Sequence, residues 1–171
     1  MVIVVMGVAG TGKTTVGRLL AQQLRWEFAD ADDYHSAANI EMIRKGIPLT
    51  DDDRRPWLRR LHTIICDWIG RGRNAVLACS ALKRCYQDEL MAGPEVQFVL
   101  LHGEANLIAQ RLRMRPGHFA GAEILSSQLA DFEEPKKALR VEIAQPPDSI
   151  VAKIREGLGI QTARSNRVLT R

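Results

Sequence analysis

The chain has 171 residues, of which 46% are hydrophobic, and this length suits one domain with a core of its own. Its formal net charge is +4, but the last eight residues hold Arg164, Arg167 and Arg171 and no acid. The rest of the chain is nearly neutral, which argues against a nucleic-acid-binding protein.

The first motif follows an apolar run at the N-terminus. Val2 to Met6 read as a buried parallel strand, and residues 7–14, GVAGTGKT, fit the phosphate-binding loop pattern. In this pattern backbone N–H groups turn toward an anion, Lys13 adds positive charge, and the Thr14 hydroxyl reaches Mg²⁺. Helical periodicity from Thr14 onward points a helix N-terminus at the phosphates. The pattern predicts a nucleotide site; the alternative is a glycine-rich turn without a ligand.

An acidic segment follows the second predicted strand, Trp26 to Ala29. Asp30 and Asp32 stand two apart, so in an extended segment both face one side, toward the phosphates if the two strands are close. One carboxylate can then hold water on Mg²⁺ while the other accepts a proton from an attacking hydroxyl. The alternative is that the acids only form a turn. Asp33 is expected to cap the next helix, and His35 is either a polyol or carboxylate ligand or an ordinary loop histidine.

Two helices are predicted next. The segment 36–46 has Ser36 as its N-cap. The run T50-D-D-D53 supplies capping oxygens and negative charge before a long helix. Its apolar residues repeat at spacings of three and four from Trp57 to Ile69, and Pro56 is expected in its first turn, where proline is tolerated.

The third predicted strand, Ala75 to Cys79, is not closed by an acid. The aspartate common at the end of a Walker B strand is missing, so metal coordination is expected to fall on Thr14 and the 30–32 carboxylates. The chain then breaks at Ser80 into a helix over 82–91. This helix start, with Lys83 beside it, suits an anionic group; the alternative is that both residues are ordinary surface residues.

A pair of arginines marks a predicted lid. A fourth strand over 96–101 precedes a helix over 105–114, and Arg111 lies one turn from Arg115. Pro116 and Gly117 stop this helix. Arginines beside such a break suit a lid whose guanidinium stabilises charge on a transferred phosphoryl group. The alternative is a solvated basic helix end.

The remaining elements complete an alternating pattern: a helix over 122–132, a strand over 139–143 and a helix over 148–157. This alternation predicts an α/β fold, a P-loop NTPase-type three-layer αβα sandwich with a mostly parallel five-stranded sheet and a small helical lid. Ligands in such a sheet collect beyond the carboxyl ends of the strands. We expect a single domain over 1–159, with the lid at about 112–122.

Two further features bear on location and partners. Cys66, Cys79 and Cys85 are odd in number and lack metal-ligand spacing, which is typical of reduced thiols. No apolar run approaches ~18 residues, so we expect a cytoplasmic protein without a membrane partner. The basic tail, 160–171, is expected to be disordered; contact with nucleic acid or an anionic surface is the alternative.

Several segments together resemble the gluconate kinases, small P-loop kinases related to the shikimate and nucleoside-monophosphate kinases. They are GVAGTGKTTVG, D30-A-D-D-Y-H35, N39-I-E-M-I-R-K-G-I-P-L-T-D-D-D-R-R-P-W-L58, C79-S-A-L-K83 and R115-P-G-H-F119. The match covers roughly residues 1–157, and GIPLTDDDRRPWL is its most distinctive piece. The resemblance implies ATP-dependent phosphorylation of D-gluconate at its 6-hydroxyl, with Mg²⁺, by a homodimer with no nucleic-acid partner.

The resemblance also implies roles for individual residues. The implied catalytic residues are Asp32 as the base, with Lys13 and Arg115. The implied nucleotide-binding residues are Gly7, Ala9, Gly10, Thr11, Gly12, Lys13, Thr14, Thr15, Arg111 and Gln145. The implied substrate-binding residues are Asp32, His35, Arg54, Ser80, Lys83 and His118, and the implied metal ligands are Thr14 and Asp30.

This chain departs from the family pattern at two places. Ala31 stands between the acids where a glycine is expected, and an alanine there requires a negative φ. Ala144 stands where an acid is often found before Gln145 and Pro146, at the loop expected to hold adenine.

Other functions remain open at this point. Shikimate or a nucleoside monophosphate would fit the same scaffold, because a fold does not decide a substrate. A non-catalytic nucleotide-dependent switch or a nucleic-acid-binding module using the arginine tail is the alternative from another class. Salt-sensitive retention on DNA that is lost on removing 160–171 would favour that module.

Overall fold

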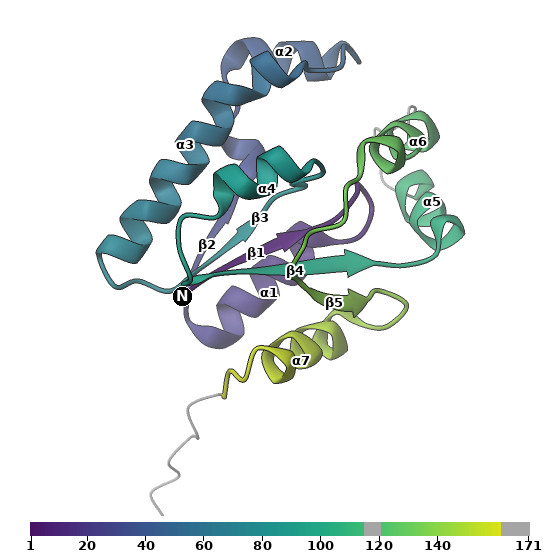
Figure 1. The fold of residues 1–171 in the computed structure, drawn as a ribbon. Coiled ribbons are helices and arrows are strands. Elements are labelled where there is room, and N and C mark those ends of the chain that lie inside the picture. Colours follow the sequence, from purple (N-terminus) through teal and green to yellow (C-terminus); the bar gives the residue numbers. More distant parts are fainter. Residues whose placement is uncertain (115–120, 162–171) are drawn as a thin grey trace, which may run out of the picture.

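The structure is a computed structural model that describes residues 1–114 and 121–161 (Figure 1). Its strands are β1 (Val2–Met6), β2 (Glu27–Asp30), β3 (Ala75–Ala78), β4 (Val96–His102) and β5 (Leu139–Glu142). Its α-helices are α1 (Lys13–Leu24), α2 (Ala37–Arg44), α3 (Asp51–Gly70), α4 (Arg84–Leu90), α5 (Ala105–Arg113), α6 (Gly121–Asp131) and α7 (Pro147–Gly157). A short 3₁₀ helix, η1 (Ala31–Tyr34), follows β2.

The strands form one parallel sheet in the order β2-β3-β1-β4-β5. β1 is central and β2 is an edge strand that pairs only with β3. Because all strands run in one direction, the loops after β1, β2 and β3 meet at the same edge of the sheet. This edge collects the phosphate-binding loop, the acidic segment and the turn after Ala78.

Alternate residues of β1 face two separate cores, as expected for a strand covered on both faces. Val2, Val4 and Met6 pack with α3 and α4, while Ile3 and Val5 pack with α1, α5 and α7. The result is the αβα sandwich that the alternation of strands and helices predicts (Figure 1).

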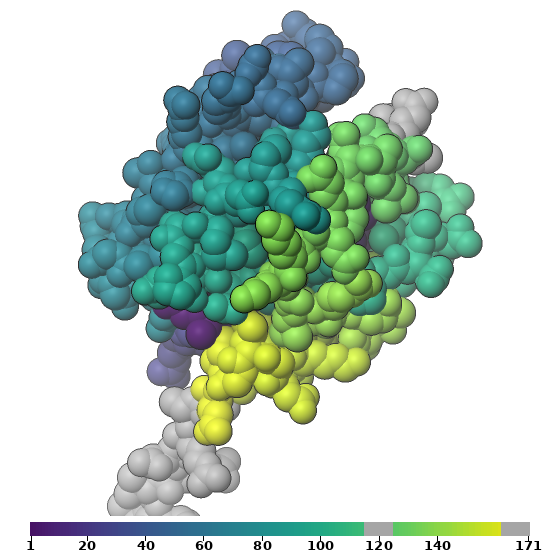
Figure 2. Space-filling model, viewed as in Figure 1, coloured from purple at the N-terminus to yellow at the C-terminus, as the bar shows by residue number. Residues whose placement is uncertain are grey.

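The chain between α6 and β5 packs against the start of α4. In Figure 2 the light-green chain beyond α6 lies against the teal of α4. Glu133 donates its backbone N–H to the carbonyl of Leu82, and the Gln87 side chain donates to the Glu133 carbonyl. These bonds fix the chain between α6 and β5 across the start of α4.

The structure corrects three local predictions around β2 and α3. Residues 31–34 form a 3₁₀ turn, not an extended segment, because the Asp30 carboxylate caps it by accepting the N–H of Asp32. Asp33 lies inside this turn, and α2 is capped by Ser36 alone. Pro56 is the sixth residue of α3 and so lies in its second turn, and the helix, which has 20 residues in all, continues past it.

The start of α4 also differs from the prediction. The helix after β3 begins at Arg84, with Lys83 as its N-cap residue, so Ser80 does not open a helix. Between them Ala81 has a φ of 44°, which turns the chain before α4 can start. The predicted lid, about 112–122, falls largely on residues 115–120, which lie outside the described residues.

Within the described part of the chain, no helix is both long and apolar enough for a membrane crossing.

Candidate active site

The loop over residues 7–14 joins β1 to α1 at the carboxyl edge of the sheet (Figure 1). Gly7 and Gly10 have φ angles of 141° and 85°, which L side chains rarely adopt. A Cβ on Gly7 would stand 2.5 Å from the carbonyl oxygen of Leu101, too close for any side chain. Backbone geometry therefore requires glycine at these two positions of the loop.

Two side chains brace the curve of this loop. The Thr11 residue is 1% exposed, and its hydroxyl donates to the carbonyl of Val8 at 2.9 Å. The Lys13 ammonium donates to the same carbonyl at 3.2 Å. Lys13 thereby holds its positive charge over the loop, where a phosphate would be bound.

Helix α1 starts directly at the loop. Gly12 is its N-cap residue, and Lys13, Thr14 and Thr15 are its first three residues. The N–H groups of a first helical turn have no partner inside the helix, and the helix dipole adds partial positive charge there. No acid occupies this first turn. The loop and helix start thus form an anion-binding arrangement.

A glutamine distant in sequence also reaches the loop. The side-chain oxygen of Gln128, on α6, accepts the backbone N–H of Ala9 at 2.6 Å. The two residues are 119 positions apart, and no pattern in the sequence singles out Gln128. α6 is thereby tied to the phosphate-binding loop.

The acidic segment meets α1 through one short contact. The Thr14 hydroxyl donates to one carboxylate oxygen of Asp30 at 2.7 Å. The other oxygen of Asp30 accepts the backbone N–H of Asp32 at 3.1 Å. The structure therefore brings together the two residues predicted to hold Mg²⁺, and places Asp32 beside them.

These groups fit a magnesium ion. Mg²⁺ prefers oxygen ligands and keeps several waters, so it is held by one or two protein groups together with substrate phosphates. The Thr14 hydroxyl and the Asp30 carboxylate supply such oxygens next to the phosphate-binding loop. Within the described residues there is no cluster of three or more His, Cys, Asp or Glu side chains that could hold a metal alone. A magnesium site that is completed by phosphate oxygens and water does not need such a cluster.

Asp32 lies in a setting that favours its protonated form. Its side chain keeps access to solvent, but the surrounding protein atoms displace much of its water. This desolvation, and next the negative charge of Asp30, raise the pKa of Asp32 above the ordinary value, while Lys13 and His35 act in the opposite direction. A carboxylate with a raised pKa is a stronger proton acceptor, which suits a general base.

His35 is fixed by an aromatic partner. Its imidazole stacks on the indole of Trp57, with ring centroids 4.5 Å apart and an interplanar angle of 11°. Desolvation lowers the pKa of His35, although the charge of Asp32 opposes this, so the ring favours its neutral form. Its Nδ1 is closed to solvent and has no hydrogen-bond partner among the described residues.

The predicted substrate residue Lys83 is paired. Its ammonium lies 2.8 Å from a carboxylate oxygen of Asp51, and the Tyr86 hydroxyl donates to the same oxygen. These hydrogen bonds, Lys83 first, lower the pKa of Asp51, and the bond to Asp51 raises the pKa of Lys83. Desolvation, followed by the bond to Asp51, raises the pKa of Tyr86 to about 12. Asp51 was expected only to cap α3, so the structure adds a link between α3 and α4.

Arg54 lies beside this cluster, whereas Ser80 contacts the phosphate-binding loop. The Arg54 guanidinium is centred 5.9 Å from the ring of Tyr86, and its Nε donates to the carbonyl of Leu49 at 3.4 Å. The carbonyl of Ser80 accepts the backbone N–H of Gly7 at 3.5 Å, which joins the turn after β3 to the phosphate-binding loop. Arg54 and Lys83 together give this side of the site positive charge.

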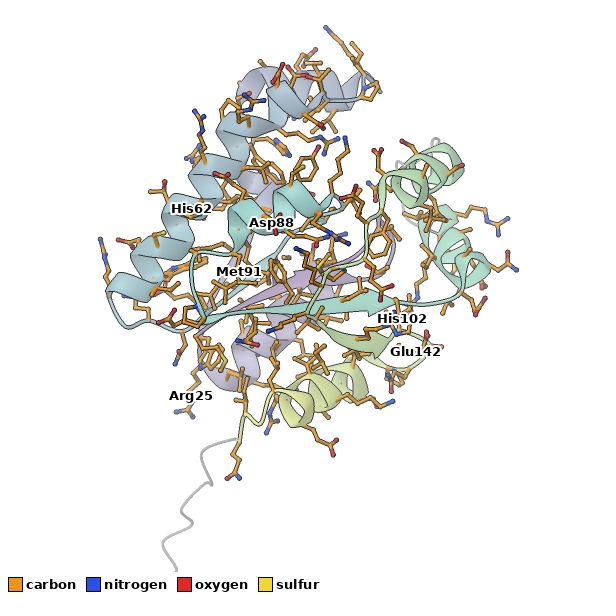
Figure 3. The ribbon with its side chains drawn as sticks, viewed as in Figure 1. Arg25, His62, Asp88, Met91, His102 and Glu142 are labelled. Atoms are coloured by element: carbon orange, nitrogen blue, oxygen red, sulfur yellow. The ribbon has the colours of Figure 1, made fainter. Side chains whose placement is uncertain are left out.

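The turn predicted to hold adenine is built on β5. The Gln145 side chain donates to the Glu142 carbonyl at 2.6 Å, and the Glu142 carboxylate accepts the N–H of Ala144 at 3.1 Å. His102 lies beside Glu142, with Nδ1 3.4 Å from the carboxylate (Figure 3). The Glu142 carboxylate therefore lies at this turn, two residues before Ala144, a contact that sequence reasoning missed.

The arginines predicted for a lid have different outcomes. Arg111 donates to the carbonyl of Ile143 at 2.9 Å, so its guanidinium lies at the turn that contains Gln145. Its nucleotide-side role stays a prediction. Arg115 and His118 lie outside the described residues.

Comparison with known proteins also indicates a kinase. The shikimate kinase family model matches residues 9–145. A gluconokinase from Gluconobacter oxydans is 42% identical over 156 residues, which cover 89% of this chain and 88% of that protein. The structure of a sugar kinase from Janibacter sp. HTCC2649, solved without ligand, superposes with a TM-score of 0.85 at 42% identity, covering 94% of this chain and 95% of that one. A gluconokinase from Sinorhizobium meliloti 1021 gives a TM-score of 0.81 at 40% identity, covering 92% and 90%.

Proposed function

The chain belongs to the gluconokinases, P-loop kinases within the shikimate kinase family, and we propose that it transfers the γ-phosphoryl group of ATP to the 6-hydroxyl of D-gluconate. The products are 6-phospho-D-gluconate and ADP. The observation that carries this proposal is the contact of the Thr14 hydroxyl with Asp30, which joins the phosphate-binding loop to the segment of Asp32. A nucleotide site and a proton acceptor then share one edge of the sheet.

The chemistry requires negative charge to be offset while a hydroxyl is deprotonated. Bound ATP with Mg²⁺ supplies the phosphoryl group and neutralises part of its charge. Lys13 adds its ammonium at the loop. Asp32 accepts the proton of the 6-hydroxyl as the hydroxyl oxygen bonds to phosphorus and the bond to the ADP oxygen breaks. Arg115 belongs to the proposal as a further positive charge at the transferred group.

On the acceptor side, gluconate offers a carboxylate and a row of hydroxyls. Arg54 and Lys83 provide positive charge for the carboxylate, and Ser80 and His118 belong to the proposal as the sequence predicts. The neutral imidazole of His35, held next to Asp32, suits the hydroxyls. Lys83 is already paired with Asp51, so an acceptor carboxylate would share or replace that partner.

The proposal also covers the extent of the domain, the oligomeric state and the cellular compartment. Residues 1–159 act as one kinase domain with a lid near 112–122, and the protein works as a homodimer in the cytoplasm. The three thiols, which form no disulfide, are consistent with a reducing compartment. No nucleic acid or membrane is required for the reaction.

The deciding experiment measures ADP release by the purified chain with ATP and Mg²⁺, against gluconate, other sugar acids, shikimate and nucleoside monophosphates. Turnover on gluconate that far exceeds every other acceptor is expected. Turnover on a different acceptor would retain the kinase and reject the substrate. Silence on all acceptors, with ATP still bound, would favour a non-catalytic switch.

A further inference from the structure

Two tryptophans of α3 hold the edge strand β2 at its two ends. The indole N–H of Trp68 donates to the carboxylate of Glu27, the first residue of β2, at 3.0 Å. The indole N–H of Trp57, eleven residues earlier on the helix, donates to the carbonyl of Ala31, just beyond the end of β2, at 2.7 Å. Both tryptophans are 6% exposed.

This support matters because β2 has a single neighbour in the sheet. It pairs with β3, and its other edge has no strand to hold it. The turn η1 then continues from β2. Its own hydrogen bonds are short-range, from Asp32 to Asp30 and from His35 to Asp32, and the Thr14 hydroxyl holds the Asp30 carboxylate at its start. A segment fixed so weakly by the sheet needs outside contacts to keep one position.

The contacts of Trp57 fall on both sides of Asp32. Its N–H binds the residue before Asp32, and its ring stacks on His35, three residues after it. Trp57 belongs to the core that contains Ala29 and Ala31, so its own position is fixed by packing. One rigid, buried side chain therefore contacts both ends of the turn that carries the carboxylate, in addition to the bond from Thr14 to Asp30.

We infer that Trp57 is a positioning residue for phosphoryl transfer: it holds Asp32 and His35 against the acceptor hydroxyl without touching substrate. This inference rests on the proposed function, because it takes Asp32 as the base. Misplacement of a reacting group by about 1 Å can lower a rate on the order of 100-fold. Loss of the Trp57 contacts should therefore lower kcat more than it affects nucleotide binding.

The test compares Trp57→Phe with Trp68→Phe. Both changes remove one indole donor from the same helix at equal burial, so both should lower the unfolding temperature. Trp57→Phe is expected to lower kcat with gluconate by about 10- to 100-fold and to leave the KM for ATP within about twofold. Trp68→Phe should keep kcat within about twofold of the unchanged chain, because its contact lies at the far end of β2.

Trp57→His supplies a conservative variant. The Nε2 of histidine can stand where the indole nitrogen stands, so it keeps the donor while losing ring area. At a pH of about 8, where imidazole is neutral, this variant should recover part of the kcat lost in Trp57→Phe. Equal kcat losses in Trp57→Phe and Trp68→Phe, or unchanged kcat in both, would overturn the inference.

A second measurement avoids any folding defect at position 57. The chain has three tryptophans, so substituting Trp26 and Trp68 in turn assigns all three indole N–H signals by NMR. Saturating gluconate with a non-hydrolysable ATP analogue should shift the Trp57 signal and leave that of Trp68 in place; an unmoved Trp57 signal would contradict the inference. If the unchanged chain has no turnover on gluconate, the proposed function itself is wrong. That result is distinct from the outcomes of the kcat comparison and of the NMR measurement, which test the role of Trp57.

Discussion

The backbone N–H of Ala9 and the side-chain oxygen of Gln128 form a 2.6 Å hydrogen bond between the phosphate-binding loop and α6. The loop is the region that must accept the phosphates, and α6 follows directly on residues 115–120. Gln128 is neutral, so it can accept this N–H without adding negative charge beside the nucleotide. The identity of the residue at 128 should therefore affect ATP binding.

Replacing Gln128 with Glu should raise the KM for ATP by about 3- to 10-fold, because a carboxylate near the loop repels the phosphates. Gln128→Ala should have a smaller effect, since it removes the contact without adding charge. Ser126→Glu is the matched control: it adds the same charge to the same helix at an exposed position. Equal KM values in the two Glu variants would show that only overall charge matters.

Lys13→Ala should impair both binding and turnover. The ammonium contacts phosphate before and during transfer, so its loss removes ground-state and transition-state interactions together. A fall in kcat of about 100-fold or more, with weaker ATP binding by calorimetry, is expected. Full activity in this variant would reject the phosphate-binding assignment of the loop.

Asp32→Asn should lower kcat by about 10²- to 10⁴-fold while leaving ATP affinity nearly unchanged, since only the proton acceptor is removed. It should also stabilise the fold at neutral pH. The folded pKa of Asp32 is raised, so the folded state is penalised above that pKa, where the carboxyl is charged in both states.

The stability gain of Asp32→Asn should therefore shrink as the pH falls through the raised pKa toward 3.8, the ordinary value. Thermal unfolding of both chains across this range measures the trend. Asp33→Asn, an exposed neighbour in the same turn, is the control for kcat and for stability. Normal turnover in Asp32→Asn would remove Asp32 from the base role.

Asp51→Asn should destabilise the protein at neutral pH, because it removes the charged acceptor of Lys83 and Tyr86. The folded pKa of Asp51 is lowered, so its contribution is present above 3.8 and is lost as the pH falls through the folded pKa. The unfolding temperatures of the variant and the unchanged chain should converge in that acidic range.

Asp52→Asn controls for the loss of an acid in the first turn of α3, since among the described residues the ion pair of Asp52 is with the exposed Arg55. Its effect should stay within about 0.5 kcal/mol. If both asparagine variants behave alike at neutral pH, the link from α3 to α4 does not contribute to stability.

Much of the fold was predictable because local signals agree with the global structure. The apolar run of β1, the loop pattern over 7–14 and the capping residue Thr50 each depend on neighbours within a few positions. Predicted ends of elements differ from the structure by one or two residues in most cases. Ser80 was misplaced because the left-handed turn at Ala81 delays α4, and alanine gives no sign of such a conformation.

The candidate site was predictable in composition and only partly in geometry. Thr14, Asp30 and Asp32 come together at the carboxyl ends of the parallel strands, but the carboxylates of a 3₁₀ turn do not face one side as those of a strand do. Gln128 and Trp57 could not be predicted as neighbours of the loop and of Asp32. Their partners lie 119 and 26 residues away, and no short-range pattern encodes such pairs.

The sequence by itself determined the alternation of strands and helices, the anion-binding loop and the residue types available for phosphoryl transfer. These properties follow from backbone freedom, apolar periodicity and side-chain chemistry, which act over a few residues. Only the tertiary structure decided which donor meets which acceptor: Trp57 with Ala31, Gln128 with Ala9, Asp51 with Lys83. The physical reason is that these contacts depend on how α3, α4 and α6 pack on the sheet, and packing is settled by the whole core at once.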